Sequence, residues 1–359
     1  MISNGALPIP AQTVARDTSA APTVWPFARA GGYPRRVTRA IPLFELSHRE
    51  ARALLARGVR VWLPVNPVEY HGPHLSLHND RLISLGLARE VHELLAAGRD
   101  EPFVVAADLE VGVDPTPGPG TRHVPFAQVR ELVLESCRAL HALGARSVIA
   151  ITWHGAPMHS LAIEPGLAWL REHGARALNP FNEAFRELCR LDARRFARAF
   201  DHIEDATDRE HMIESLRYDF HAGFFETSMA LHYAPASVSA HRDVPPCLPI
   251  PPDPNLQRAS RVARAIGRIE LADELAMIAM ALGWQSLSPF PGYTAQPHLA
   301  RAESGAVFAA EIASGYAEII SDVLAGRRDA PAPPMRWIAT LTANGRLAPK
   351  VKSAALHAQ

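Results

Sequence analysis

Residues 59–80 read VRVWLPVNPVEYHGPHLSLHND, and this stretch decides the fold. Residues 59–65 are typical of a buried strand, and a helical pattern runs from Asp80 to Leu95. Glu69 and His71 lie two positions apart, so their side chains point to the same side of an extended segment. Carboxylates mixed with imidazoles suit zinc, manganese or iron. Carboxylates that can bridge favour two ions over one.

Strand-like and helical segments alternate after this stretch. Residues 103–107 and 147–152 are apolar runs typical of strands, and a periodic helix is predicted over residues 126–143. A loop rich in glycine and proline covers residues 112–125. This alternation is typical of a mostly parallel sheet covered on both faces. We therefore expect an α/β fold, a three-layer αβα sandwich, with a final helix over residues 303–324.

The chain of 359 residues is expected to form one large domain over residues 42–326. Residues 1–41 are rich in proline, alanine, threonine and arginine and are predicted to be a flexible N-terminal arm. Residues 327–359 are predicted to be a C-terminal tail. Two insertions are expected, a charged helical one at about residues 175–217 and one that starts proline-rich at about residues 241–280.

The composition argues against several classes of protein. Lys plus Arg and Asp plus Glu both total 37, so no global charge favours nucleic acid or an anionic membrane as a partner. Three cysteines without a close pair argue against a disulfide framework and favour reduced thiols in a cytoplasmic protein. The sequence has no run of about 18 apolar residues and no secretory signal pattern.

Two further polar groups join the first. His154 comes just after the strand predicted at residues 147–152. Because ligands of open parallel sheets bind beyond the carboxyl ends of the strands, we expect His154 to approach Glu69. The third group contains His221 and Glu226 at the start of a helical run. Glu226 also has a purely structural interpretation as a cap of that helix.

These motifs resemble those of the creatininase family of metal-dependent amidohydrolases over about residues 42–326. Pro64 through Asp80 and His221 through Ser228 match specific family motifs, and the second of these is unchanged. Thr152 through Pro157 matches a glycine-rich turn with substitutions, and Gly292 through Ala300 loosely matches a late pattern. The substitutions change the pocket wall more than the ligands, so they argue against creatinine as the substrate.

The resemblance implies a creatininase-like fold with two divalent ions per subunit, zinc first and manganese or iron as alternatives. Glu69, Asp80 and His154 would hold one ion. His71, Asp80 and Glu226 would hold the other, with Asp80 bridging and a hydroxide between the ions as nucleophile. His221 would carry a proton to the leaving nitrogen. His221 and Glu226 are thus the catalytic residues expected, and family relatives suggest a homo-oligomer, a hexamer.

The leading hypothesis is an amidohydrolase that cleaves a non-peptide C–N bond in a small polar molecule, such as an amide, cyclic amide or formamide. His221 would then contact the substrate, and Trp153 would stack on it or simply fill the core. One alternative is a peptidase that trims a short precursor peptide. Another is a non-catalytic binding protein on the same fold. The sequence contains neither the G-x-S-x-G motif of serine hydrolases nor the H-E-x-x-H motif of zincins, which argues against both classes.

Overall fold

The computed structural model describes residues 39–106 and 108–347 and contains a five-stranded sheet in the order β1-β3-β2-β4-β5. Every pair of neighbouring strands is parallel. This confirms the predicted α/β class. The strands are short: β1 Ile41–Pro42, β2 Val61–Pro64, β3 Val104–Val105, β4 Ser147–Ile151 and β5 Arg176–Leu178.

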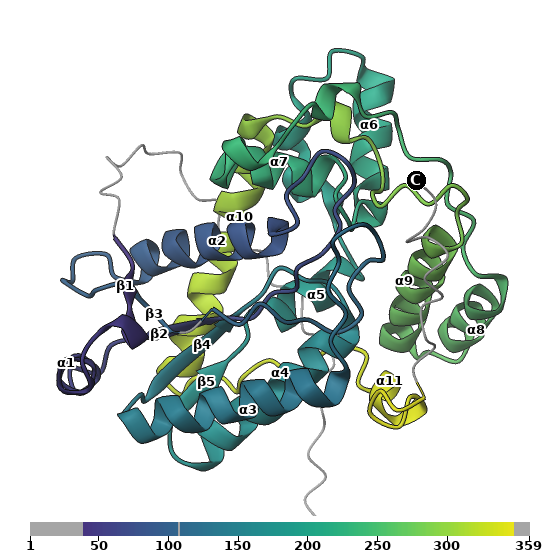
Figure 1. The fold of residues 1–359 in the computed structure, drawn as a ribbon. Helices are drawn as coiled ribbons and strands as arrows, with labels where there is room; N and C mark the ends of the chain where they lie inside the picture. The colour runs from purple at the N-terminus through teal and green to yellow at the C-terminus, as the bar shows by residue number, and fades with distance from the viewer. Residues whose placement is uncertain (1–38, 107, 348–359) are drawn as a thin grey trace, which may run out of the picture. The chain divides into compact units, whose positions relative to one another are not determined.

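Helices cover both faces of the sheet (Figure 1). One layer contains α1 His48–Leu55, α3 Phe126–Leu143 and α4 Pro157–Glu172. The opposite layer contains α2 Asn79–Leu95, α7 Phe224–Tyr233 and α10 Ala302–Leu324, which contact one another. The remaining helices are α5 Phe181–Leu188, α6 Ala206–Ser215, α8 Pro254–Ala265, α9 Ile269–Gln285 and α11 Trp337–Leu341.

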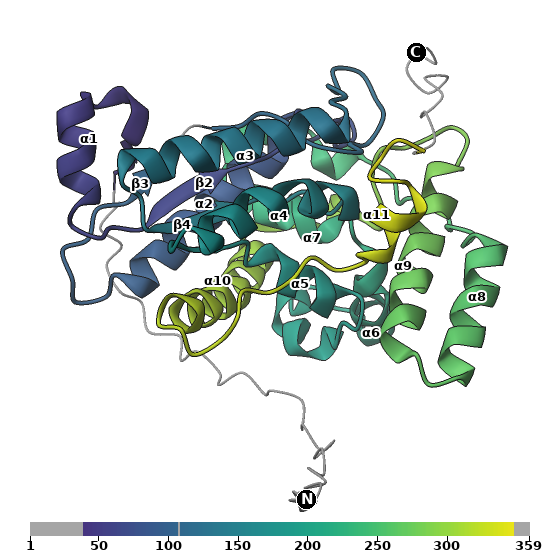
Figure 2. The ribbon, with the colours of Figure 1, turned by 90° about the horizontal axis from the view of Figure 1, so that it is seen from below.

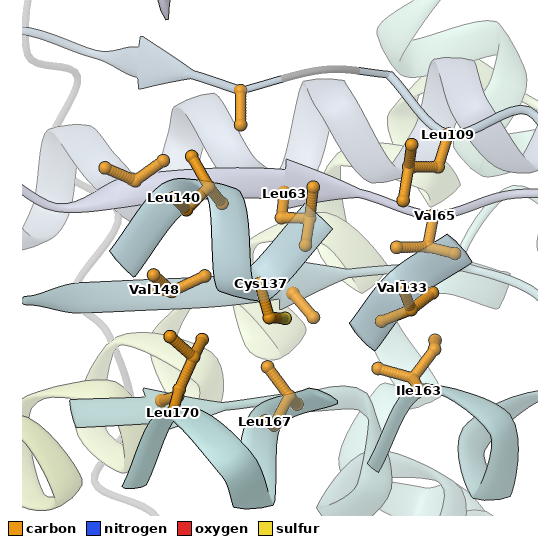
Figure 3. Packing of buried hydrophobic residues seen from close by; sticks show 14 of the residues in the cluster. Leu63, Val65, Leu109, Val133, Cys137, Leu140, Val148, Ile163, Leu167 and Leu170 are labelled. Carbon is orange, nitrogen blue, oxygen red and sulfur yellow. The ribbon is translucent and has the colours of Figure 1, made fainter. Parts of the chain in front are cut away.

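The main hydrophobic core lies between the sheet and helices α3 and α4 (Figure 3). Val61 and Leu63 of β2 point into this core, as does Val65 just after it, whereas Trp62, between Val61 and Leu63, packs edge-on against Phe103. Successive side chains of a strand point to opposite faces, so a continuous apolar run supplies both layers. Cys137 on α3 is fully buried in the same core, as expected for a thiol that packs as a small apolar side chain.

The order of the strands reverses between β2 and β4. From β2 the chain passes through α2 to β3 on one side, then through α3 to β4 on the other side. Pro64 at the end of β2 is in register with Ile151 at the end of β4. Such a switch point opens a crevice beyond the carboxyl ends of the strands, where ligands bind in folds of this class. The polar stretch after each of these strands therefore leads into one place.

The predicted insertions have regular structure. Residues 175–217 begin with β5, which belongs to the sheet, and continue through α5 and α6. Residues 241–280 contain α8 and most of α9, which lie side by side as a helical hairpin (Figure 2). Their status as insertions stays a prediction. The predicted arm lies almost wholly outside the described residues, as does the tail beyond residue 347.

The first part of the predicted tail is folded. Asn182 Nδ2 donates to Pro331 O at 3.0 Å, which fixes the chain after α10 against α5. Glu274 on α9 accepts hydrogen bonds from Met335 N at 2.8 Å and from Trp337 Nε1 at 2.7 Å. We call this pair of contacts the Glu274 clasp. Among the described helices, none is long and apolar enough to cross a membrane.

Candidate metal centre

Two clusters of acidic and histidine side chains meet at the carboxyl ends of β2 and β4. Each cluster contributes three side chains, and within each the potential ligand atoms lie within 4.8 Å of one another. All six side chains are buried. The first cluster is Glu69, Asp80 and His154, and the second is His71, His221 and Glu226.

The first cluster combines the stretch after β2, the first turn of α2 and the residue that follows β4. His154 Nδ1 lies 2.8 Å from Glu69 Oε2 and 3.6 Å from Asp80 Oδ2. Both of these oxygens are buried, and when His154 is neutral with its proton on Nε2 they accept no hydrogen bond from the described residues. Buried carboxylate oxygens without donors are costly unless a cation compensates them. This cluster is the set predicted from the sequence for one ion.

The second cluster combines the stretch after β2 with the segment that leads into α7. His71 Nε2 lies 3.9 Å from Glu226 Oε2, and the rings of His71 and His221 stack with centroids 4.3 Å apart. Asp80 joins this cluster to the first, because its Oδ1 lies 3.2 Å from His71 Nε2 while its Oδ2 faces His154. One carboxylate therefore faces both clusters, as a bridging ligand would.

The three histidines share one hydrogen-bonding pattern. His71 Nδ1 donates to the carbonyl of Glu69 at 3.1 Å, His154 Nε2 to that of Val113 at 2.9 Å, and His221 Nε2 to that of Tyr70 at 3.1 Å. A carbonyl only accepts, so these nitrogens carry the proton. The other nitrogen of each neutral ring carries a lone pair that faces the carboxylates. Metal-ligating histidines are held in this way, so the residues present fit a pair of divalent ions.

The electrostatics of the site favour positive charge among the carboxylates. Burial opposes the charge on His71, but Asp80, Glu69 and Glu226 outweigh it and raise its pKa to about 10. Burial likewise opposes the charge on His154, but Glu69 and Asp80 raise its pKa to about 9. Protons on these rings thus occupy the lone pairs that a metal ion would use. Metal ions and protons compete for the same atoms.

Burial and neighbouring charges also shift the pKa values of the carboxylates and of His221. Burial raises the pKa of Glu226 to about 8 and also raises that of Asp80. Burial alone would raise the pKa of Glu69, but the facing histidines, His154 first among them, hold it well below its usual range. Burial and the nearby His71 lower the pKa of His221 to about 3, so its ring is neutral near pH 7.

Comparison with known proteins places this chain in a family. The family model described as creatininase, creatinine amidohydrolase, matches residues 44–320. The chain belongs to the creatininase family. A crystal structure of creatinine amidohydrolase superposes with a TM-score of 0.52 at 22% identity and covers 80% of this chain and 98% of its own. A mutant creatininase of the Zn-Zn type superposes with a TM-score of 0.50 at 20% identity, over 79% and 98% of the two chains.

A relative with a peptide substrate in its name is also similar. The mycofactocin precursor peptide peptidase of Mycolicibacterium smegmatis is 29% identical over 180 residues. The match covers 50% of this chain and 59% of that relative, so this chain spans about three fifths of the relative's length. Creatininase-family membership is therefore clear, whereas the similarity to the peptidase concerns part of each protein.

The loop of residues 112–125 supplies backbone contacts that sequence reasoning missed in this creatininase-family chain. Thr116 N donates to Glu69 Oε1 at 2.6 Å, and the carbonyl of Val113 accepts from His154 as described above. Gly112 and Gly118 permit the close approach, because a Cβ there would lie 2.6 Å from Pro67 and 2.3 Å from Tyr70. The glycine and proline content of the loop was the available signal, but it marks a turn and not a partner.

Glu226 is placed so that it could serve in both of the roles that the sequence left open. It occupies the first turn of α7, and its Oε2 accepts a hydrogen bond from Ala222 N at 2.6 Å. The same oxygen lies 3.9 Å from His71 Nε2. A carboxylate has lone pairs for both contacts, so capping the helix does not remove Glu226 from the candidate ligand set.

The structure places the remaining predicted residues as follows. His221 groups with His71 and Glu226 as a potential ligand, a role the sequence analysis did not assign to it. Trp153 is 6% exposed and packs against Phe181 and Phe225, so its indole mainly fills the wall of the site. Stacking of Trp153 on a substrate stays a prediction.

Proposed function

We propose that this chain is a metal-dependent hydrolase that cleaves a C–N bond in a small polar molecule, such as an amide, cyclic amide or formamide. The observation that carries the proposal is the buried convergence of three imidazole lone pairs and three carboxylates around Asp80. Glu69, Asp80 and His154 would hold one ion. His71, Glu226 and Asp80 would hold the second, with His221 within ligand reach.

A pair of divalent ions supplies a water-derived nucleophile at neutral pH and polarises a carbonyl group. The protein's own residues orient the reaction. Backbone carbonyls fix the ring planes of all three histidines, so the positions of the lone pairs are set before substrate arrives. His221 would accept at Nδ1 the proton that the attacking water gives up and pass it to the leaving nitrogen, because its Nε2 is held by the carbonyl of Tyr70.

His221 Nδ1 cannot bind an ion and shuttle a proton at the same time. Replacing His221 by Gln separates the two roles, because the variant keeps a side chain of similar length without an imidazole. If His221 only shuttles a proton, the variant still binds two zinc ions per chain and loses turnover. If His221 is a ligand, zinc binding at the second cluster weakens together with turnover.

The proposal is tested by metal analysis of the purified chain together with turnover of a panel of small amides, cyclic amides and formamides. We expect two zinc ions per chain after reconstitution, with manganese and iron as the competing choices. A chain that binds less than one ion per subunit after reconstitution contradicts the proposal and favours a non-catalytic binding protein on this fold.

A second candidate is a peptidase that trims a short precursor peptide. Its support is the partial similarity to the mycofactocin precursor peptide peptidase. The same zinc-loaded protein should be given short peptides and the small amides in parallel, with products identified by mass spectrometry. Release of terminal residues from peptides without turnover of the small amides would favour the peptidase.

Assembly and location remain predictions. We expect a homo-oligomer, a hexamer by family resemblance, in the cytoplasm. Light scattering on the purified chain measures the assembly directly.

A further inference from the structure

A loosely matching motif of the sequence lies against the turn that carries two candidate ligands. Thr294, within the segment Gly292 through Ala300, is fully buried, and its N–H donates to His221 O at 2.8 Å. His221 N donates in return to Thr294 Oγ1 at 3.3 Å. The Thr294 hydroxyl also lies 3.3 Å from Asp219 Oδ1 and 3.0 Å from His221 O, either of which can accept its proton.

The turn from Asp219 to Glu226 has an unfavourable backbone conformation that other contacts must stabilise. Ala222 has a φ of 48°, in the left-handed region that is unfavourable for a residue with a Cβ. A Cβ on the next residue, Gly223, would lie 1.9 Å from Asp219 Oδ1 and 2.7 Å from Thr294 O. The surrounding contacts must therefore fix this conformation.

Asp219 supplies part of that support from inside the turn. It is 3% exposed, and its Oδ2 accepts a hydrogen bond from Phe225 N in the first turn of α7 at 2.7 Å. Ala222 N donates to Glu226 Oε2, so the start of α7 is held by two carboxylates. Thr294 then connects this start to a segment more than 70 residues later in the chain. His221 and Glu226 lie on either side of the strained residue.

We propose that Asp219 and Thr294 are positioning residues for the second metal ion. They hold the turn on which His221 and Glu226 face His71, while the first cluster takes its side chains from other segments. This inference rests on the proposed function, because it assumes that the second cluster binds an ion. It predicts that loss of the Thr294 hydroxyl weakens one ion of the pair and spares the other.

A purely structural role would lower stability without selecting one ion, so the test measures both. Thr294→Val removes the hydroxyl at nearly constant volume, and Thr294→Ser keeps it. Ser260→Ala is the matched control, because buried Ser260 donates a comparable hydrogen bond to Ala272 O at 2.7 Å in the α8–α9 hairpin. Zinc affinity is measured by competition with a chromogenic chelator, and Tm by thermal unfolding of the metal-free chains.

We expect Thr294→Val to bind one zinc ion as the unaltered chain does and the other about 10- to 100-fold more weakly, the usual effect of removing a group that orients a metal ligand. Thr294→Ser should stay within about threefold on the same scale. Ser260→Ala should lower Tm by about 2–4 °C, as expected for a lost hydrogen bond, and leave both zinc affinities unchanged.

Two outcomes overturn the inference. One is a Thr294→Val chain that binds both zinc ions as tightly as the unaltered chain. The other is a Thr294→Val chain in which the affinities for both zinc ions fall together with Tm, while Ser260→Ala shows the same joint loss. Thr294→Ala, which also lacks the hydroxyl, takes the place of Thr294→Val if that chain does not fold. An unaltered chain that binds fewer than two zinc ions contradicts the proposed function instead, so the two failures are distinguishable.

Discussion

Asp80 is the side chain on which the two clusters depend. Its two oxygens face different histidines, His71 at 3.2 Å and His154 at 3.6 Å. Substitution of a glutamate or histidine that has a ligand atom in only one cluster should weaken the binding of one ion only. If Asp80 bridges two ions as proposed, loss of its charge removes a negative ligand from both of them at once.

Replacing Asp80 by Asn should therefore weaken the binding of both zinc ions and lower turnover by more than about 100-fold. The amide has the shape of the carboxyl group, so the circular dichroism spectrum should stay that of the unaltered chain. Asp108→Asn, at a partly exposed residue paired with Arg81, is the control and should keep both ions. Full zinc content in the Asp80→Asn chain would contradict the bridging role.

Zinc binding should release protons. In the metal-free chain the pKa values of His71 and His154 are about 10 and about 9, so both rings are protonated at pH 7. A ligating nitrogen must lose its proton, so affinity should rise with pH, by about tenfold per unit for each proton released. Calorimetry at pH 7 in buffers of different ionisation enthalpy counts these protons. A binding enthalpy that is the same in all buffers would contradict this picture.

At the scale of elements, α4 packs tightly against α3 at Gly166. A Cβ there would lie 2.9 Å from Cys137 Sγ, 3.1 Å from Val133 Cγ1 and 3.2 Å from Val133 O. The last of these is a backbone atom, which cannot move aside without shifting α3. The absence of a side chain at Gly166 thus sets the distance between the two helices that cover the main core.

Gly166→Ala should lower the free energy of unfolding by about 0.5–2 kcal/mol, since crowding of about 1–3 kcal/mol outweighs a gain in helix propensity of nearly 1 kcal/mol. Urea denaturation measures the change. Cys137→Ala in the same chain removes the nearest side-chain atom, so the double variant should be more stable than the sum of the two single effects. Strict additivity would show that the contact with Cys137 is not the cause.

The elements also show where sequence reasoning succeeds. The helix predicted over residues 126–143 is α3, and in the structure Ser47 forms a full capping box with Glu50 at the start of α1. Both depend on local patterns. β1 and β5, at two and three residues, are too short to show any period, and they are strands because they pair with β3 and β4. Helix α4 was missed, and it carries Pro165 in its interior.

At the scale of the whole molecule, the Glu274 clasp joins the chain after α10 to the α8–α9 hairpin. The Glu274 side chain is nearly buried and accepts from one backbone and one indole N–H group. Further along the same helix, Trp284 packs against His221 with ring centroids 5.0 Å apart. The C-terminal segment and the candidate metal centre therefore contact the same helix.

Glu274→Ala should lower the free energy of unfolding by about 1–3 kcal/mol, because it leaves two donors without an acceptor. Glu274→Gln keeps one acceptor oxygen and should lose less. Glu210→Ala, which breaks an exposed pair with Arg194, is the control and should change the same quantity by at most about 1 kcal/mol. Equal losses in Glu274→Ala and Glu210→Ala would mean that the clasp does not stabilise the fold.

Only part of the candidate site could be predicted from the sequence. Glu69, His71 and Asp80 stand in one stretch, and the parallel topology brings His154 to them, so the side chains could be named. The groups that orient them could not, because Thr116 acts through its N–H and Val113 through its carbonyl, and every residue except proline has both. Asp219 and Thr294 meet only after folding.

The anchoring of the three imidazoles by main-chain oxygens has a consequence for how such a site can diverge. No substitution deletes a peptide carbonyl, so the anchors survive any exchange of the side chains of Glu69, Tyr70 or Val113. A change in the path of residues 112–125 would instead move the Val113 carbonyl and so turn the imidazole of His154. The aim of one candidate ligand can therefore change while all the candidate ligands stay the same.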